Sequence, residues 1–296
     1  MLSEKEKVID KKKYQNSIMQ IIEIDELQGA RNKNTYNDLF FMKQINVKPK
    51  YIRIILNNDK LTTEAGALYY LNGNIKSDVE IGNVVNVTKK IFRKLATQEK
   101  IFNPIYIGKG EVILEPSFGH FLLLELNNEE IIVDKSMYYC SLGDIEISTF
   151  TQKNASSVLI GGEGLFQTKI SGSGIVGLSL DVPISEVKKY ELEEGQVLQV
   201  DGNFAVLRSG NIKFTVEKSS KSLLHSAVSG EGFLQTFRGN GVVWLTPTSC
   251  IYSKLESVSK KSSERTKHSN KNKERKKKKS KFGMNGILEH IERLGD

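Results

Sequence analysis

The stretch that decides the fold occurs twice in this sequence: GEGLFQTKISGSGIVGL begins at Gly162, and GEGFLQTFRGNGVVWL begins at Gly230. The second copy matches the first with one residue deleted, so that Gln167 aligns with Gln235. A decayed third copy, QEKIFNPIYIGKGEVIL, begins at Gln98 and aligns with the first without a gap. Self-similarity at a fixed period is the signature of repeated structural units.

A second block repeats between these copies with nearly the same period. It begins at Leu56 as LNNDKLTTEAGALYYLNGNIK, at Leu126 as LNNEEIIVDKSMYYCSLGDIE, and at Leu192 as LEEGQVLQVDGNFAVLRSGNIK. Because two independent blocks share one period, we predict a triplication of about 60 to 70 residues per unit.

Each unit has the pattern of short strands. Apolar residues alternate or cluster, and Ile, Val, Tyr and Phe are frequent among them. Four dipeptides are typical of tight hairpin turns because they tolerate a positive φ: Asn72-Gly73, Gly143-Asp144, Gly210-Asn211 and Asn240-Gly241. We therefore predict an all-β chain with three internally repeated β-sandwich- or barrel-like units related by pseudo-threefold symmetry.

The pattern also predicts the limits of these parts. A charged N-terminal segment covers residues 1–16, and the triplicated domain covers 17–257, with units near 56–120, 126–186 and 192–257. A disordered Lys-rich tail follows at 258–281, and a short amphipathic helix at 282–296. Four segments are interpreted as further strands: SIMQIIEIDEL, DLFFMKQI, YIRIIL and SCIYSKLES. Residues 88–96 are interpreted as a helix, and residues 3–13 as a second, weakly patterned helix.

The repeated segments resemble a known family. The combination of GEGLFQT, GEGFLQTFRGNGVVWLTP and LEEGQVLQVDGNFAV is similar to the altered inheritance of mitochondria protein 24 family over roughly residues 50–255. That resemblance implies a fold like the trp RNA-binding attenuation protein, with units that often assemble further. It supplies no established biochemical activity. The first unit departs from the pattern, because Gln98-Glu99-Lys100 replaces the GEG of the other units.

The charge is concentrated in the tail. The whole chain has a net charge of +8, but the segment from Ser259 to Lys281 alone carries an excess of basic residues larger than that, so the rest is slightly acidic. Such a run binds polyanions through counterion release. RNA and an anionic membrane surface are the alternative partners, and the binding residues are predicted to be Lys271, Lys273, Arg275, Lys276, Lys277, Lys278, Lys279 and Lys281.

One polar set recurs at equivalent places in the repeat, namely Glu99, Glu163 and Glu231. Under threefold symmetry these carboxylates would converge at a ligand or ion site; the simpler interpretation is a turn carboxylate that accepts backbone N–H bonds. The GEG segments lack the helix that a phosphate-binding loop requires. The four histidines have no metal-ligand spacing, and no nucleophile elbow is present.

The sequence therefore predicts a non-enzymatic β-scaffold or binding protein without a cofactor or metal, assembled as a homo-oligomer and tethered by its tail. A nucleic-acid-associated protein and a membrane-surface protein are the alternatives. No apolar run is long enough to cross a bilayer, and the charged N-terminus is no secretory signal. Two cysteines give no disulfide framework. We expect a cytoplasmic protein; the alternative is a cytoplasmic protein that associates peripherally with a membrane.

Overall fold

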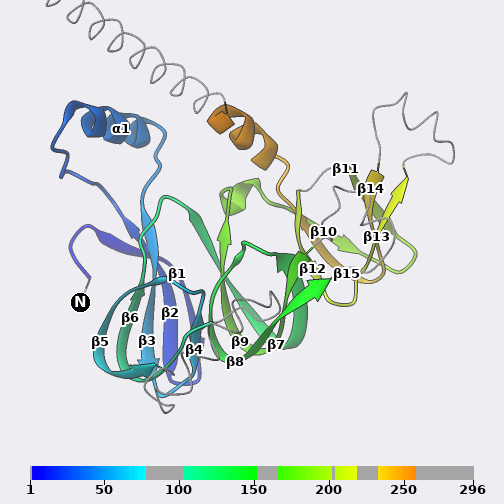
Figure 1. The fold of residues 1–296 in the computed structure, drawn as a ribbon, viewed down its shortest axis with the longest axis horizontal. Coiled ribbons are helices and arrows are strands. Elements are labelled where there is room, and N and C mark those ends of the chain that lie inside the picture. Colours follow the sequence, from blue (N-terminus) through cyan, green and yellow to red (C-terminus); the bar gives the residue numbers. More distant parts are fainter. Residues whose placement is uncertain (1, 78–102, 152–165, 202–203, 219–232, 258–296) are drawn as a thin grey trace, which may run out of the picture. The chain divides into compact units, whose positions relative to one another are not determined.

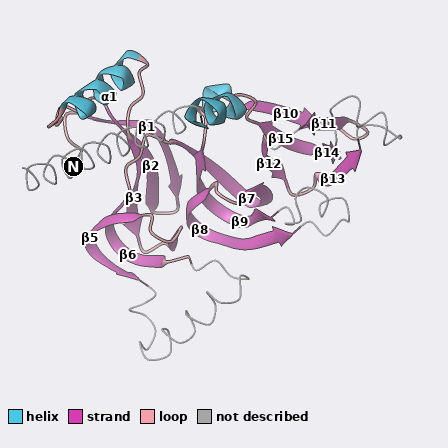
Figure 2. Cartoon of the chain, turned by 45° about the horizontal axis from the view of Figure 1, so that its top comes forward, coloured by secondary structure: helices cyan, strands magenta, loops and turns pink. Residues whose placement is uncertain are grey.

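A computed structural model of the chain describes residues 2–77, 103–151, 166–201, 204–218 and 233–257. Figures 1 and 2 show a molecule built mainly of antiparallel strands. The elements are β1 (Glu6–Tyr14), β2 (Ser17–Ile24), α1 (Lys33–Gln44), β3 (Lys50–Asn57), β4 (Leu61–Thr63), β5 (Leu68–Ser77), β6 (Ile105–Leu114), β7 (His120–Asp134), β8 (Tyr138–Thr151), β9 (Phe166–Leu180), the 3₁₀ turn η1 (Ile184–Glu186), β10 (Lys188–Leu192), β11 (Val197–Asp201), β12 (Ala205–Ser209), β13 (Lys213–Lys218), β14 (Phe233–Arg238) and β15 (Gly241–Leu245). The predicted fold class, mostly β, is confirmed.

The described strands form two sheets. Twelve strands make one sheet in the order β1-β2-β3-β6-β4-β8-β9-β7-β12-β15-β10, with β5 paired to the remaining side of β6. Strands β11, β14 and β13 make a second, three-stranded sheet. Every strand pairing is antiparallel, which suits a chain whose connections are mostly short.

Three long ribbons organise the two sheets. They consist of β5 with β6, β8 with β9, and β12–β13 with β15–β14. A G-x-G pair lies in β6 (Gly108/Gly110), in β9 (Gly172/Gly174) and where β14 leads into β15 (Gly239/Gly241). All six glycines have a positive φ, between +115° and +159°. At the first two pairs, an added Cβ would overlap a backbone oxygen of the adjacent strand.

The predicted hairpin turns divide into two groups. Gly210 and Asn211 do form the turn between β12 and β13. The prediction for Asn72-Gly73 and Gly143-Asp144 was wrong, because both dipeptides lie inside strands, β5 and β8. There the positive φ bends a continuous strand instead of reversing the chain, a use of glycine that a turn dipeptide resembles in sequence.

The apolar side chains gather along the large sheet in successive clusters. The first lies around Ile52 and Leu142, the second around Ile170 and Trp244, and the third, between the two sheets, around Phe214. Trp244 is buried, and the ammonium of Lys189 lies 4.2 Å from its ring centroid. This tryptophan therefore packs in the second apolar cluster.

Three local predictions were wrong. Residues 3–13 are not helical: β1 pairs with β2, and pairing outweighs a weak helical pattern. DLFFMKQI is not a strand but the second half of α1, where Asn32 caps the helix by accepting from the Thr35 N–H. Residues 249–257 form a helix instead of the strand expected to close the sheet, with Ile251 and Leu255 one helical turn apart.

The strands expected in SIMQIIEIDEL and YIRIIL are confirmed as β2 and β3. The helix expected at residues 88–96 lies outside the described residues, as do the Lys-rich tail and the terminal amphipathic segment. The threefold repeat, its unit boundaries and the likeness to the trp RNA-binding attenuation protein stay predictions, because the described pairings do not by themselves establish three equivalent units.

Candidate functional site

Helix α1 lies beyond the ends of β2 and β3, away from the strands (Figure 1). Its N-terminus is capped by Asn32, and its C-terminus ends where the Val47 N–H donates to the Met42 carbonyl. None of its side chains is buried. Helices in globular proteins normally gain their stability from an apolar face packed on the core. This helix instead keeps its aromatic side chains at the surface.

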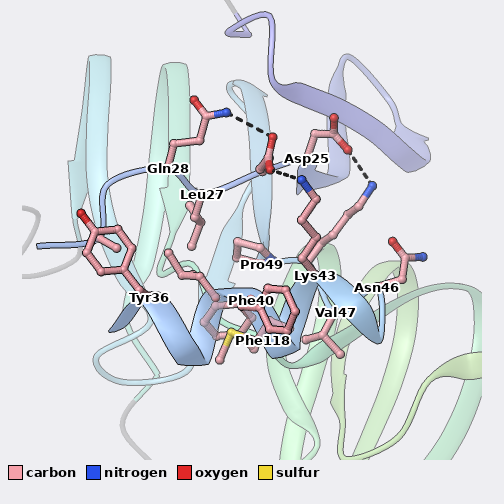
Figure 3. A pocket seen from close by; sticks show the side chains of 15 residues that line it. Asp25, Leu27, Gln28, Tyr36, Phe40, Lys43, Asn46, Val47, Pro49 and Phe118 are labelled. Carbon is pink, nitrogen blue, oxygen red and sulfur yellow. Dashed lines mark hydrogen bonds and ion pairs between the residues drawn. The ribbon is translucent and has the colours of Figure 1, made fainter. Parts of the chain in front are cut away.

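An open apolar cleft of about 680 Å³ lies against this helix. Figure 3 shows α1 on one side of the cleft, with Leu27, Pro49 and Phe118 among the side chains gathered in front of it. The full lining is Asp25, Glu26, Leu27, Gln28, Ala30, Tyr36, Leu39, Phe40, Met42, Lys43, Asn46, Val47, Lys48, Pro49 and Phe118. The volume falls within the range of roughly 300 to 1,000 Å³ that is usual for small-molecule sites.

The cleft uses one face of α1. Tyr36, Phe40 and Lys43 follow one another at helical spacing and line it, while Phe41 does not. Phe40 and Phe41 are similarly exposed, at 58% and 64%, and their rings meet edge to face. Two adjacent phenylalanines thus differ in whether they face the cleft, which makes them a matched pair for mutation.

Ion pairs fix the rim of the cleft. The Lys43 ammonium lies 2.6 Å from Glu26 Oε1, and the Lys48 ammonium lies 2.6 Å from Asp25 Oδ1. The hydrogen bond from Lys43 lowers the pKa of Glu26, and the hydrogen bond from Lys48 lowers the pKa of Asp25. Both carboxylates are therefore ionised at neutral pH. An apolar floor with charged and amide groups at its rim suits an amphiphilic molecule.

A second polar group lies inside the β body. Arg208 is 3% exposed, its guanidinium lies between the rings of Phe150 and Phe214 at 5.1 and 5.2 Å, and it donates to the side-chain oxygen of Gln167 at 3.3 Å. Its Nε has no hydrogen-bond partner among the described residues. Burial lowers the pKa of Arg208 to about 10. The nearby carboxylate of Glu130 is paired with Lys169, so no carboxylate of the described residues forms an ion pair with this buried cation.

The residues predicted from the sequence lie elsewhere. Glu99, Glu163 and Glu231 and the eight basic tail residues are all outside the described residues, so their roles stay predictions. Of the two cysteines, Cys140 is buried in β8, where burial raises the pKa of its thiol to about 12. Cys250 is exposed and helical, contrary to the expected strand position.

Among the described residues, no group of three or more His, Cys, Asp or Glu side chains gathers in a way that would hold a metal ion. Within the same residues, no helix is both long enough and apolar enough to cross a membrane.

Sequence reasoning missed the cleft. The one signal in the sequence was the start of a helix. Asn32 is a capping residue, Thr35 follows it, and the next apolar residues are spaced four positions apart. The β-rich surroundings favoured a strand for the same run.

The fold and the cleft define a mostly β protein with an open surface cleft. Comparison with known proteins gives the family: the model for the mitochondrial biogenesis AIM24 family matches residues 42–248. The chain belongs to that family, which is the one that the GEG segments resembled.

Two streptococcal proteins are similar to this chain. An uncharacterized protein of Streptococcus pyogenes serotype M6 is 22% identical over 190 residues, which cover 62% of this chain and 74% of that protein. The crystal structure of a Streptococcus pyogenes protein aligns with a TM-score of 0.51 and 19% identity, covering 72% of this chain and 94% of that one. At this identity the second likeness supports the fold alone.

Proposed function

We propose that this protein is a non-enzymatic binding protein that takes an amphiphilic small molecule into the α1 cleft. The observation that carries the proposal is α1 itself, a capped helix with no buried side chain whose aromatic face lines an open cleft. Because Tyr36 and Phe40 stay in contact with water, the fold does not gain the free energy of burying their rings, which is about 25 cal/mol for each Å² of apolar surface. An apolar ligand that covers the two rings would gain that free energy on binding.

The lining defines the chemistry of the occupant. Aromatic and aliphatic side chains form the floor, so the buried part of the ligand is apolar. Lys43 and Lys48 stand at the rim within ion pairs, and an anionic group on the ligand competes with Glu26 and Asp25 for them. We therefore propose a ligand with a ring or chain of less than about 680 Å³ and one anionic end.

The test uses anilinonaphthalene sulfonate, which has aromatic rings and one sulfonate. The full-length protein should bind it saturably, with one site per chain by fluorescence titration. Phe40→Ala should weaken binding about tenfold, because a loss of roughly 1.4 kcal/mol corresponds to that factor. Phe41→Ala is the matched control and should leave the Kd within twofold. Equal effects of the two substitutions, or no saturable binding, would refute the proposal.

The same proposal has a second part, the tethering of a homo-oligomeric scaffold by the basic tail. Twelve Lys or Arg and two Glu lie between Ser259 and Lys281, and such a run attracts phosphate-bearing polyanions through counterion release. Truncation after Ser259 should abolish retention on single-stranded RNA and on vesicles that contain phosphatidylserine. Retention on one support only would identify the source of the phosphate. Retention that the truncation does not change would refute a tethering role.

A further inference from the structure

Strand β5 forms an open edge of the large sheet. It pairs with β6 from Leu68 to Ser77, and none of the described residues pairs with its other side. Tyr70 is 48% exposed, and Tyr69 and Leu71 are exposed as well. Ile107 of the neighbouring strand β6 and Ile55 of β3, the strand beyond β6, are also exposed. An edge of this kind offers a full row of unpaired N–H and C=O groups to another strand.

The other two edges of the same sheet are protected. β1 carries four lysines among its nine residues, and β10 begins with Lys188 and Lys189. Lysine on an edge strand is a usual means of preventing strand pairing between molecules. By contrast, the eleven residues from Ala65 to Ile75 contain no charged side chain. Within the described sheet, β5 is therefore the edge that tolerates a partner.

The sequence of β5 indicates which partner. Tyr70-Leu71-Asn72-Gly73-Asn74-Ile75-Lys76 is nearly symmetric about Gly73, with an asparagine on each side of it and a branched aliphatic residue beyond each asparagine. Two identical strands that meet in antiparallel orientation about a twofold axis present the same residues to each other twice. A strand that is symmetric about its centre is complementary to its own copy.

We infer that β5 pairs with β5 of a second copy of this chain, in antiparallel register centred on Gly73. In that register Leu71 lies opposite Ile75 of the second copy, and Asn72 lies opposite its Asn74. Tyr70 lies opposite Lys76, so the ammonium is placed beside an aromatic ring and not beside the other lysine. Each of these pairs occurs twice. The inference rests on the homo-oligomer of the proposed function and supplies its contact surface.

Charge substitutions at the two asparagines test the register. Both side chains are exposed, so both can be replaced without disturbing the core. Asn72→Lys/Asn74→Lys places like charges opposite each other twice, which destabilises the pairing. Asn72→Lys/Asn74→Glu places opposite charges at the same two positions. Tyr190→Lys, on the protected edge β10, is a control for adding a lysine to an edge strand.

Sedimentation equilibrium of the full chain should give twice the chain mass of 33.3 kDa. The Lys/Lys variant should raise the dimer Kd at least tenfold, while the Lys/Glu variant should stay within about threefold of the unsubstituted protein and become weaker in high salt. Far-UV circular dichroism and thermal unfolding verify that each variant is folded.

A monomer at 100 µM would overturn both the inferred contact and the oligomeric part of the proposed function. An assembly that survives the Lys/Lys change, or equal effects of the two double variants, would overturn the β5 contact alone. Dye binding in the α1 cleft is a separate readout, and its failure leaves the β5 inference unaffected.

Discussion

Substitution of Gly172 by alanine tests how tightly the longest ribbon is packed. Gly172 lies in β9, between β7 and β8, opposite Ile145 of β8 and Glu129 of β7. β7 has a bulge at this level, where Asn128 has a φ of +58°. A Cβ on Gly172 would overlap the carbonyl oxygen of Asp144 and lie 3.2 Å from its carbonyl carbon. Both of these neighbours are backbone atoms, which cannot rotate away.

Two costs add up in the Gly172→Ala variant. Gly172 has a φ of +124°, a value that costs an alanine roughly 1 to 2 kcal/mol. The overlap must also separate β8 from β9 locally and weaken the two flanking ladder hydrogen bonds, at about 1 kcal/mol each. We expect a loss of about 3 to 4 kcal/mol in the free energy of unfolding. That loss corresponds to a decrease in Tm of roughly 6 to 15 °C for a domain of this size.

Gly195 is the matched control, because it shares the strain but not the contact. Its φ is +87°, and an added Cβ would meet no atom within 4 Å. Gly195→Ala should therefore cost only about 1 kcal/mol. Urea unfolding followed by the fluorescence of Trp244, which is buried in the second apolar cluster, measures both variants. A difference of less than about 0.5 kcal/mol between them would refute the close packing of β8 against β9.

Three further changes have signs that the structure determines. Hydrogen bonds from Arg238 and Thr215 lower the pKa of Glu217 from 4.5 to about 2. Since the pKa is lower in the folded state, the ionised Glu217 stabilises the fold fully above pH 4.5, and this contribution is lost as the pH falls to about 2. The Glu217–Arg238 pair is partly exposed, so we expect the free energy of unfolding to fall by up to about 1 kcal/mol over this pH range. Arg238→Met should reduce this fall when urea unfolding is measured at both ends of the range, and an unchanged fall would contradict the assignment to Arg238. Ser17→Ala should cost about 2 kcal/mol by urea unfolding, because the buried Ser17 hydroxyl donates to Asp59 Oδ2 at 2.5 Å; a loss below 0.5 kcal/mol would contradict this. Arg208→Met should be neutral or stabilise the protein by about 1 kcal/mol, since it replaces a buried cation whose Nε has no hydrogen-bond partner in the described part of the chain; a loss above 2 kcal/mol would show that the guanidinium is needed.

The β class followed from features that depend on short stretches of chain. The glycine pairs such as Gly172-Ser173-Gly174 and the clustered Ile, Val and Tyr residues of EIIVDKSMYY were both visible in the sequence. What the glycines do there was less visible. Gly143 has the composition of a turn, but its strand continues because β9 pairs with β8 on both sides of it. Long-range pairing of this kind is absent from a local pattern.

The candidate site was harder to predict for a related reason. An apolar run of four residues, Leu39-Phe40-Phe41-Met42, fits a buried strand and a helix equally well by periodicity. A strand needs a neighbour. β2 and β3 pair directly with each other, and none of the described strands pairs with the segment that connects them. The cap at Asn32 then decides in favour of a helix. The strand interpretation failed because the pairing of β2 with β3 was not known from the sequence.

That same pairing explains why the helix remains at the surface. Because β2 and β3 are already neighbours in the sheet, α1 is not required to complete the core, and a short polar turn would connect the two strands equally well. The chain instead has a capped twelve-residue helix that carries three aromatic side chains and leaves them exposed. Local features that do not contribute to the stability of the fold tend to mark functional sites. The cleft of α1 is therefore the first place to test for a ligand, and the dye titration of Phe40→Ala against Phe41→Ala separates a binding role from a merely exposed helix.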